Sequence, residues 1–189
     1  MIASKQINIK RVAQWIEPFA VVANLLFTYL YIQQSPWCFL FGILGPLLLM
    51  LPLFQTRLFA EVGLQCIYIL LAVFGLFRIS DNWQVVNFAN DSHLLLVFIG
   101  IFFSVITGLV LKRISKASVP FVDSATTVFS IIATVLMMIP VHEAWLYFIC
   151  INFVSIIMYA YRKLFFGAMM FFIYLIMSID AYFTFGIFS

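Results

Sequence analysis

Seven long apolar runs dominate this sequence and leave few folds open to it. Each has about the 20 residues that a helix needs to cross the hydrocarbon core of a bilayer. The polar segments between them are short, so we expect an all-α integral membrane protein with one membrane domain over residues 1–189. The predicted spans are Trp15–Gln33, Trp37–Phe54, Phe59–Ile79, Leu94–Leu111, Val119–Ile139, Ala144–Tyr161 and Leu164–Phe185.

The charged residues support this count of spans. They make up 9% of the chain, whereas soluble domains carry about 25%. If the spans alternate in direction, one side of the membrane receives Arg78 alone, and the other receives Lys5, Lys10, Arg11, Arg57, Lys112, Arg113, Lys116, Arg162 and Lys163. The positive-inside rule then predicts a cytoplasmic N-terminus and an external C-terminus. The net charge of +3 follows from these loops and predicts no nucleic-acid partner.

The first three spans resemble the last three. Residues 57–68 and 163–174 share a basic-Leu-Phe start and an Ile-Tyr end at an offset of 106, and Glu17 matches Asp123 at the same offset. This predicts a 3+1+3 parallel duplication, with a first three-helix bundle at 15–79, a linker helix at 94–111 and a second bundle at 119–185. Chance similarity among apolar helices is the alternative.

Polar side chains recur at helical spacing inside five of the spans. Examples are Asp123, Thr126 and Thr127 in the fifth span, and Trp145 with Asn152 in the sixth. Polar groups inside a bilayer usually face a bundle interior or a wet cavity, so we expect a central pathway between the two bundles. Each stripe also has a structural interpretation, because hydroxyls bond to their own helix and amides join neighbouring helices.

Catalytic and metal-binding patterns are missing from the sequence. The three cysteines, Cys38, Cys66 and Cys150, lie in spans without CxxC spacing. His142-Glu143 is not followed by the second histidine of a zinc motif, and no nucleophile–base pair is evident. We therefore expect neither an enzyme nor a bound cofactor or metal. A transporter and a non-transporting membrane scaffold or sensor remain as candidate functions.

Several motifs resemble the PnuC family of bacterial vitamin transporters over nearly the whole chain. They include Asp123-Ser-Ala-Thr-Thr127, Glu143-Ala-Trp145 and Leu64-Gln65-Cys-Ile-Tyr68. The resemblance implies a SWEET-like 3+1+3 fold in the bacterial cytoplasmic membrane. It implies uptake of a small vitamin by facilitated diffusion, followed by trapping through a cytoplasmic vitamin kinase. It also permits a homotrimer.

Three departures from the nicotinamide riboside members of that family bear on the substrate. The sixth span reads Glu143-Ala-Trp145-Leu-Tyr-Phe148 where Glu-Asn-Trp-x-x-Trp is usual. The third span often ends in Gly-Trp-x-x-Trp, but here Gly75 is not followed by either tryptophan. The seventh span carries Asp180 where glycine is common. The lost indole and amide and the added carboxylate favour thiamine. Nicotinamide riboside is the alternative.

Both vitamins carry a fixed positive charge on an aromatic ring, so a site for either needs aromatic faces for cation–π contact. It also needs amides or hydroxyls for the polar substituents, and a carboxylate could balance the charge. The predicted substrate-binding residues are Asn24, Trp37, Gln65, Tyr68, Asp123, Thr126, Thr127, Glu143, Trp145, Tyr147, Asn152, Tyr174 and Asp180. For Asp123 the alternative is structural, because a carboxylate is also favoured at the start of a helix.

Overall fold

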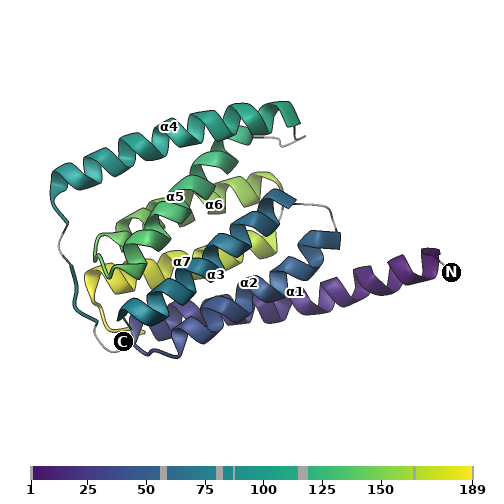
Figure 1. Ribbon diagram of the computed structural model, residues 1–189, viewed down its shortest axis with the longest axis horizontal. Coiled ribbons are helices and arrows are strands. Elements are labelled where there is room, and N and C mark those ends of the chain that lie inside the picture. Colours follow the sequence, from purple (N-terminus) through teal and green to yellow (C-terminus); the bar gives the residue numbers. More distant parts are fainter. Residues whose placement is uncertain are drawn as a thin grey trace. The chain divides into compact units, whose positions relative to one another are not determined.

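The computed structural model describes residues 2–55, 59–79, 83–86, 88–114, 119–163 and 165–188. These residues form seven helices: α1 (Ile2–Ile32), α2 (Cys38–Gln55), α3 (Phe59–Ile79), α4 (Asn90–Ile114), α5 (Pro120–Met138), α6 (Ala144–Tyr161) and α7 (Phe165–Phe183) (Figure 1). The predicted spans for α3 and α6 match to the residue. Some predictions concern positions outside the described part, namely Arg57 and Lys116 and the side chains of Lys5, Lys10, Arg11 and Glu17.

The first helix is longer than predicted. It begins at Ile2, although the apolar run begins only at Trp15. Lysine, arginine and glutamine are good helix formers. The helix can therefore begin well before the apolar run does. Pro18 lies inside this helix. Membrane helices tolerate such a proline where neighbouring groups satisfy the freed carbonyl.

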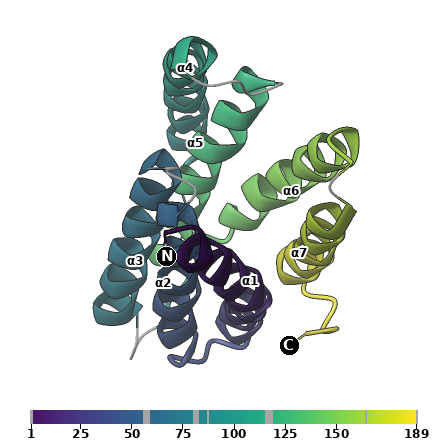
Figure 2. The ribbon, with the colours of Figure 1, turned by 90° about the vertical axis from the view of Figure 1, so that its right-hand side faces the viewer.

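The chain divides into two compact units. One comprises residues 1–83 with Phe188, and the other comprises residues 84–187 with Ser189. In the first unit α2 packs against both α1 and α3. In the second unit α6 packs against both α5 and α7, while α4 packs against α5. Figure 2 shows α4 beside α5 and α6 beside α7. The middle helix of each group of three thus contacts both of its neighbours.

Many large apolar side chains are exposed, as expected for a protein surrounded by lipid. Leu94, Phe98 and Phe102 on α4 are each about 60% exposed, and no water-soluble surface would keep so large an apolar area open. Four helices, α3 to α6, have described stretches long and apolar enough to cross a bilayer. The described apolar stretches of the other three, 18–32, 38–50 and 167–183, are shorter.

Glycines allow α2 to approach both of its neighbours closely. A Cβ at Gly45 would meet the amide oxygen of Asn24 on α1, and a Cβ at Gly42 would lie 2.9 Å from Phe27 and 3.2 Å from Ala72. Such small residues are typical of packed membrane helices, because apolar lipid gives them no hydrophobic driving force to associate. The first unit is therefore held by close packing along α2.

The ends of α1 and α6 are built by residues in the left-handed conformation. Gln34 has φ 53°, Ser35 donates its N–H to the Leu30 carbonyl at 2.9 Å, and Gln34 donates to the Tyr31 carbonyl at 3.0 Å. These two bonds form a Schellman motif that satisfies the last carbonyls of α1. After α6, Lys163 has φ 60°. The chain then turns into α7.

A short backbone pairing orders the connection between α5 and α6. Val86 forms an isolated bridge with Val141, and the Val86 N–H donates to the Pro140 carbonyl at 3.0 Å. The segment that precedes α4 is thereby joined to the segment that precedes α6. This pairing places the first turn of α4 close to the start of α6.

Candidate functional site

Three polar side chains meet where α4 and α6 begin. The Tyr147 hydroxyl lies 3.2 Å from Nδ1 of His93, and Oε2 of Glu143 lies 3.8 Å from Nε2 of the same imidazole. Glu143 is the N-cap of α6 but makes no side-chain capping bond. The site therefore combines a carboxylate, a phenol and an imidazole in one partly buried cluster.

Trp145, in the first turn of α6, adds an aromatic surface. Trp145 is only 9% exposed, and its ring centroid lies 6.1 Å from that of Phe148. Glu143, Trp145 and Tyr147, which the sequence predicts to bind substrate, thus all lie in the first turn of α6 or at its cap. Glu143 and Tyr147, four residues apart, lie on one face of the helix, whereas Trp145 lies on another.

Deeper in the second unit, polar groups join α6 to α7. Asn152 is buried, and its amide donates to the Ser178 hydroxyl at 3.2 Å. The Ser178 hydroxyl donates in turn to the Tyr174 carbonyl at 2.7 Å. The predicted site residues Asn152 and Tyr174 are thus linked through Ser178, as expected where an amide joins two membrane helices.

The Asp180 carboxylate is hydrogen-bonded to the backbone of the protein. Its side chain is 2% exposed, and Oδ1 accepts a hydrogen bond from the Ile187 N–H at 2.9 Å. The carboxylate therefore anchors the segment that follows α7. The structure gives this residue a structural role that the sequence pattern did not reveal.

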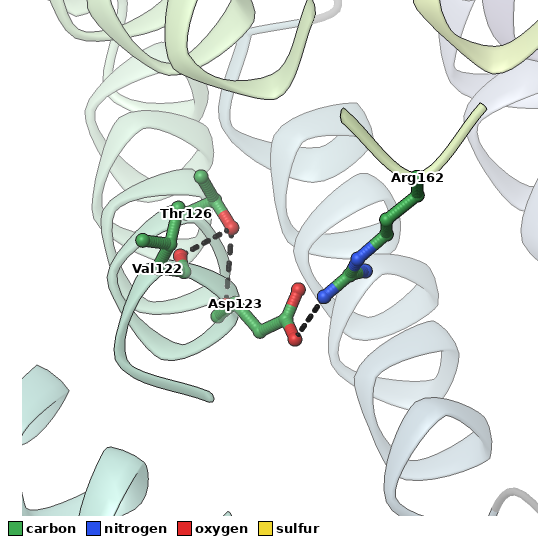
Figure 3. A network of polar contacts seen from close by, with 4 residues as sticks. All are labelled: Val122, Asp123, Thr126 and Arg162. Carbon is green, nitrogen blue, oxygen red and sulfur yellow. Dashed lines mark hydrogen bonds and ion pairs between the residues drawn. The ribbon is translucent and has the colours of Figure 1, made fainter. Parts of the chain in front are cut away.

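Asp123 also has a partner within the protein. Arg162, which follows α6, donates to Oδ2 of Asp123 at 2.6 Å (Figure 3). Both side chains are about one quarter exposed. On the same helix, Thr126 donates to the carbonyls of Val122 and Asp123, each at 3.0 Å. These contacts agree with the structural alternatives for both residues, and Thr127 is exposed.

An apolar cavity of about 380 Å³ lies among α4, α5 and α6. Its wall is almost wholly apolar, because the Thr126 hydroxyl that borders it is turned to its own helix. The lining residues are Val97, Ala125, Thr126, Phe129, Leu146, Tyr147, Cys150, Ile151 and Val154. A polar substrate would find almost no hydrogen-bonding groups there, so this cavity is distinct in character from the polar cluster.

Four predicted site residues lie in the first unit. Asn24 packs its amide against Gly45, while Gln65 and Tyr68 are half-buried on α3. Trp37, immediately before α2, is 70% exposed. An exposed tryptophan at a helix end is typical of the membrane interface.

Within the described residues of each unit, no group of three His, Cys, Asp or Glu side chains has the arrangement of a metal site.

His93 is the residue that sequence reasoning did not include in the site. Its partners Glu143 and Tyr147 lie 50 or more residues further along the chain, so no local motif joins them. One signal was present: the chain contains only two histidines, and His93 stands where a polar loop meets an apolar span.

Comparison with known proteins assigns the chain to a family. The family model described as nicotinamide mononucleotide transporter matches residues 14–185. Two curated relatives, the nicotinamide riboside transporter PnuC of Escherichia coli (strain K12) and that of Shigella flexneri, are each 26% identical over 178 residues. Each alignment covers 77% of this chain and 74% of the relative.

A solved structure shares the fold. The crystal structure of the vitamin B3 transporter PnuC matches with a TM-score of 0.71 at 21% identity, covering 89% of this chain and 79% of that one. The named relatives are transporters and not enzymes. The family match spans nearly all of the apolar helices, and so the chain belongs to the PnuC family of multi-pass membrane vitamin transporters.

Proposed function

We propose that this chain transports nicotinamide riboside across the bacterial cytoplasmic membrane. The observation that carries the proposal is its likeness, over 77% of its length, to two relatives named as transporters of that compound. This favours the riboside over thiamine. The expectation of thiamine rested partly on Asp180 as an extra anion, but that carboxylate accepts the Ile187 N–H.

The start of α6 supplies the chemistry that a pyridinium ring requires. Trp145 and Tyr147 offer aromatic faces for cation–π contact, worth about 2 kcal/mol or more when desolvated. Glu143 offers a carboxylate at the N-terminus of α6. We therefore place the ring of the substrate at Glu143 and Tyr147, which lie four residues apart on one face of α6, and propose Trp145 as a further aromatic contact from another face of the helix. The hydroxyls and amide of the substrate remain to be satisfied by other predicted residues, such as Asn152 in the same unit.

The same residues argue for a riboside and against its phosphate ester. A phosphate group carries a charge of about −1.5 to −2 at neutral pH and is usually held by arginine, lysine or a helix N-terminus. The predicted binding residues include no arginine or lysine. The N-termini of α4 and α6 at this cluster carry Asp91 and Glu143, which would repel a phosphate.

A 3+1+3 duplication is the proposed basis of transport. Supporting it, Thr28 donates to the Asn24 carbonyl and Thr134 donates to the Ser130 carbonyl, two equivalent bonds at an offset of 106 residues. In both groups of three, the middle helix contacts the other two. Repeats of this kind allow a substrate site to open alternately to either side.

We infer the orientation of the chain in the membrane from its charges. Lys112 and Arg113 end α4, and Arg162 and Lys163 follow α6. These ends share one side if the helices alternate in direction, and the positive-inside rule makes that side cytoplasmic. The starts of α4 and α6, with Glu143, then face outward. Facilitated diffusion, trapping by a cytoplasmic kinase and a trimeric assembly are the further proposals from the family resemblance.

Titration calorimetry on the purified protein tests the substrate directly. Nicotinamide riboside, nicotinamide mononucleotide, thiamine and riboflavin are titrated side by side. We expect saturable binding of the riboside only. Tight binding of thiamine alone would overturn the proposal and restore the first expectation, while binding of the mononucleotide in preference would contradict the charge argument.

Two variants connect the binding to the predicted residues. Trp145→Ala and Gln65→Ala are expected to abolish riboside binding in a protein that stays monodisperse. Because Trp145 is buried, Trp145→Phe serves as the conservative variant that keeps an aromatic face, and it should retain measurable binding. Full affinity in both alanine variants would remove these residues from the site.

A further inference from the structure

The chain contains two histidines, His93 and His142, and the structure gives them different partners. Histidine is the side chain whose unperturbed charge change falls between pH 5 and 8. His93 and His142 are therefore the two side chains to test for an effect of pH in that range. Among the described side chains, His93 alone of the two has a carboxylate within 4 Å.

His93 lies between groups from α6 and from the loop before α4. Tyr147 contacts Nδ1, Glu143 faces Nε2, and the Phe88 ring lies edge-on with its centroid 5.6 Å away. Tyr147 and Glu143 are the titratable groups that the described residues place against the ring. Asp91, two residues earlier on α4, is exposed.

The contact between His93 and Glu143 is too long for a hydrogen bond. Nε2 and Oε2 are both shielded from solvent, lie 3.8 Å apart and have no hydrogen-bond partner among the described residues. A neutral imidazole carries one N–H, whereas the protonated ring carries two and a positive charge. Protonation therefore converts this gap into an ion pair, and a small side-chain movement would close it to hydrogen-bond distance.

We infer that His93 is a positioning residue, whose protonated ring pairs with the Glu143 carboxylate and withdraws it from a cationic substrate. The pair would also add a second link between α4 and the start of α6, beside the contact of His93 with Tyr147. The inference rests on the proposed function insofar as Glu143 meets the substrate ring. It predicts that acid weakens riboside binding, although the ring charge of the riboside is fixed.

His142 provides a matched control. Its Nε2 lies 3.1 Å from the Tyr182 carbonyl, and its ring stacks on that of Tyr182 with centroids 5.0 Å apart. A carbonyl can only accept, so Nε2 already carries the proton in the neutral ring. Protonation of His142 thus adds no new partner of opposite charge at this contact.

Riboside affinity is measured at pH 5.5 and pH 8.0 for the wild type, His93→Gln and His142→Gln. For the wild type and His142→Gln we expect affinity weaker by roughly fivefold or more at pH 5.5, a typical size for coupling between two binding events. His93→Gln should change by less than about twofold. The same pH dependence in His93→Gln, or its loss in His142→Gln alone, would overturn the inference.

A second measurement separates this inference from the proposed substrate. Thermal unfolding without substrate is followed for a double-mutant cycle of His93→Gln and Glu143→Gln at both pH values. We expect coupling between the two residues at pH 5.5 and its loss at pH 8.0. Absence of coupling at pH 5.5 would overturn the role of His93. Coupling without riboside binding at any pH would instead refute the proposed substrate.

Discussion

At the scale of single residues, the structure separates carboxylates that hold the protein together from one that is available to a ligand. Asp123 is bound to Arg162, and Asp180 is bound to the Ile187 N–H. Within the described residues, the charged neighbour of the Glu143 carboxylate is Nε2 of His93, 3.8 Å away. Among these three carboxylates, Glu143 is therefore the one whose charge a cationic substrate could use.

The Asp123–Arg162 pair makes this distinction testable. Asp123→Asn or Arg162→Gln should lower the free energy of unfolding by about 1.5–3 kcal/mol, because each change removes a charged hydrogen bond in a partly buried position. Unfolding by denaturing detergent gives this quantity, and a double-mutant cycle isolates the pair. Riboside affinity should stay within about twofold of the wild type. A stable Asp123→Asn variant that no longer binds would return Asp123 to the substrate site.

At the scale of helices, close packing depends on a few glycines. Gly45 lies against the Asn24 amide, Gly108 against Phe121 and Gly167 against Tyr159, each at a contact between neighbouring helices. Because lipid is as apolar as the helix surfaces, such close contacts carry much of the association between membrane helices.

Gly45→Ala and Gly63→Ala form a matched pair of substitutions. A Cβ at Gly45 would collide with the Asn24 amide, whereas a Cβ at Gly63 meets nothing within 4 Å in the described part of the chain. We expect Gly45→Ala to destabilise the protein by about 1–3 kcal/mol through overpacking. Gly63→Ala should be neutral or stabilising by up to about 1 kcal/mol, because alanine favours the helix. Equal effects in the two variants, measured by thermal unfolding, would contradict the packing described for α1 and α2.

Helices were more predictable from the sequence than side-chain contacts. The ends of α3 and α6 follow from the change between apolar and polar residues. The start of α1 at Ile2 does not, because hydropathy indicates which residues lie in the membrane and not where a helix begins. The helical spacing of Thr126 and Asn152 predicts a shared face. It does not show that Thr126 bonds to its own helix or that Asn152 bonds to Ser178. His93 was missed because its partners come from a distant helix.

At the scale of the whole molecule, two compact units share one pattern of contacts. In each, a middle helix packs against two others, and Thr28 and Thr134 each bond back to their own helix. The family match over residues 14–185 and the TM-score of 0.71 to a solved PnuC structure support the fold independently. The substrate is a separate question, because a shared fold does not fix what is bound.

Uptake by the protein in sealed liposomes tests the central proposal most directly. Labelled nicotinamide riboside should enter in the absence of ATP or an ion gradient. Excess unlabelled riboside should compete, and thiamine should not. Glu143→Gln should reduce uptake, and Gly63→Ala serves as the folded control. Uptake of thiamine instead of the riboside, or riboside uptake no faster than in empty liposomes, would contradict the account.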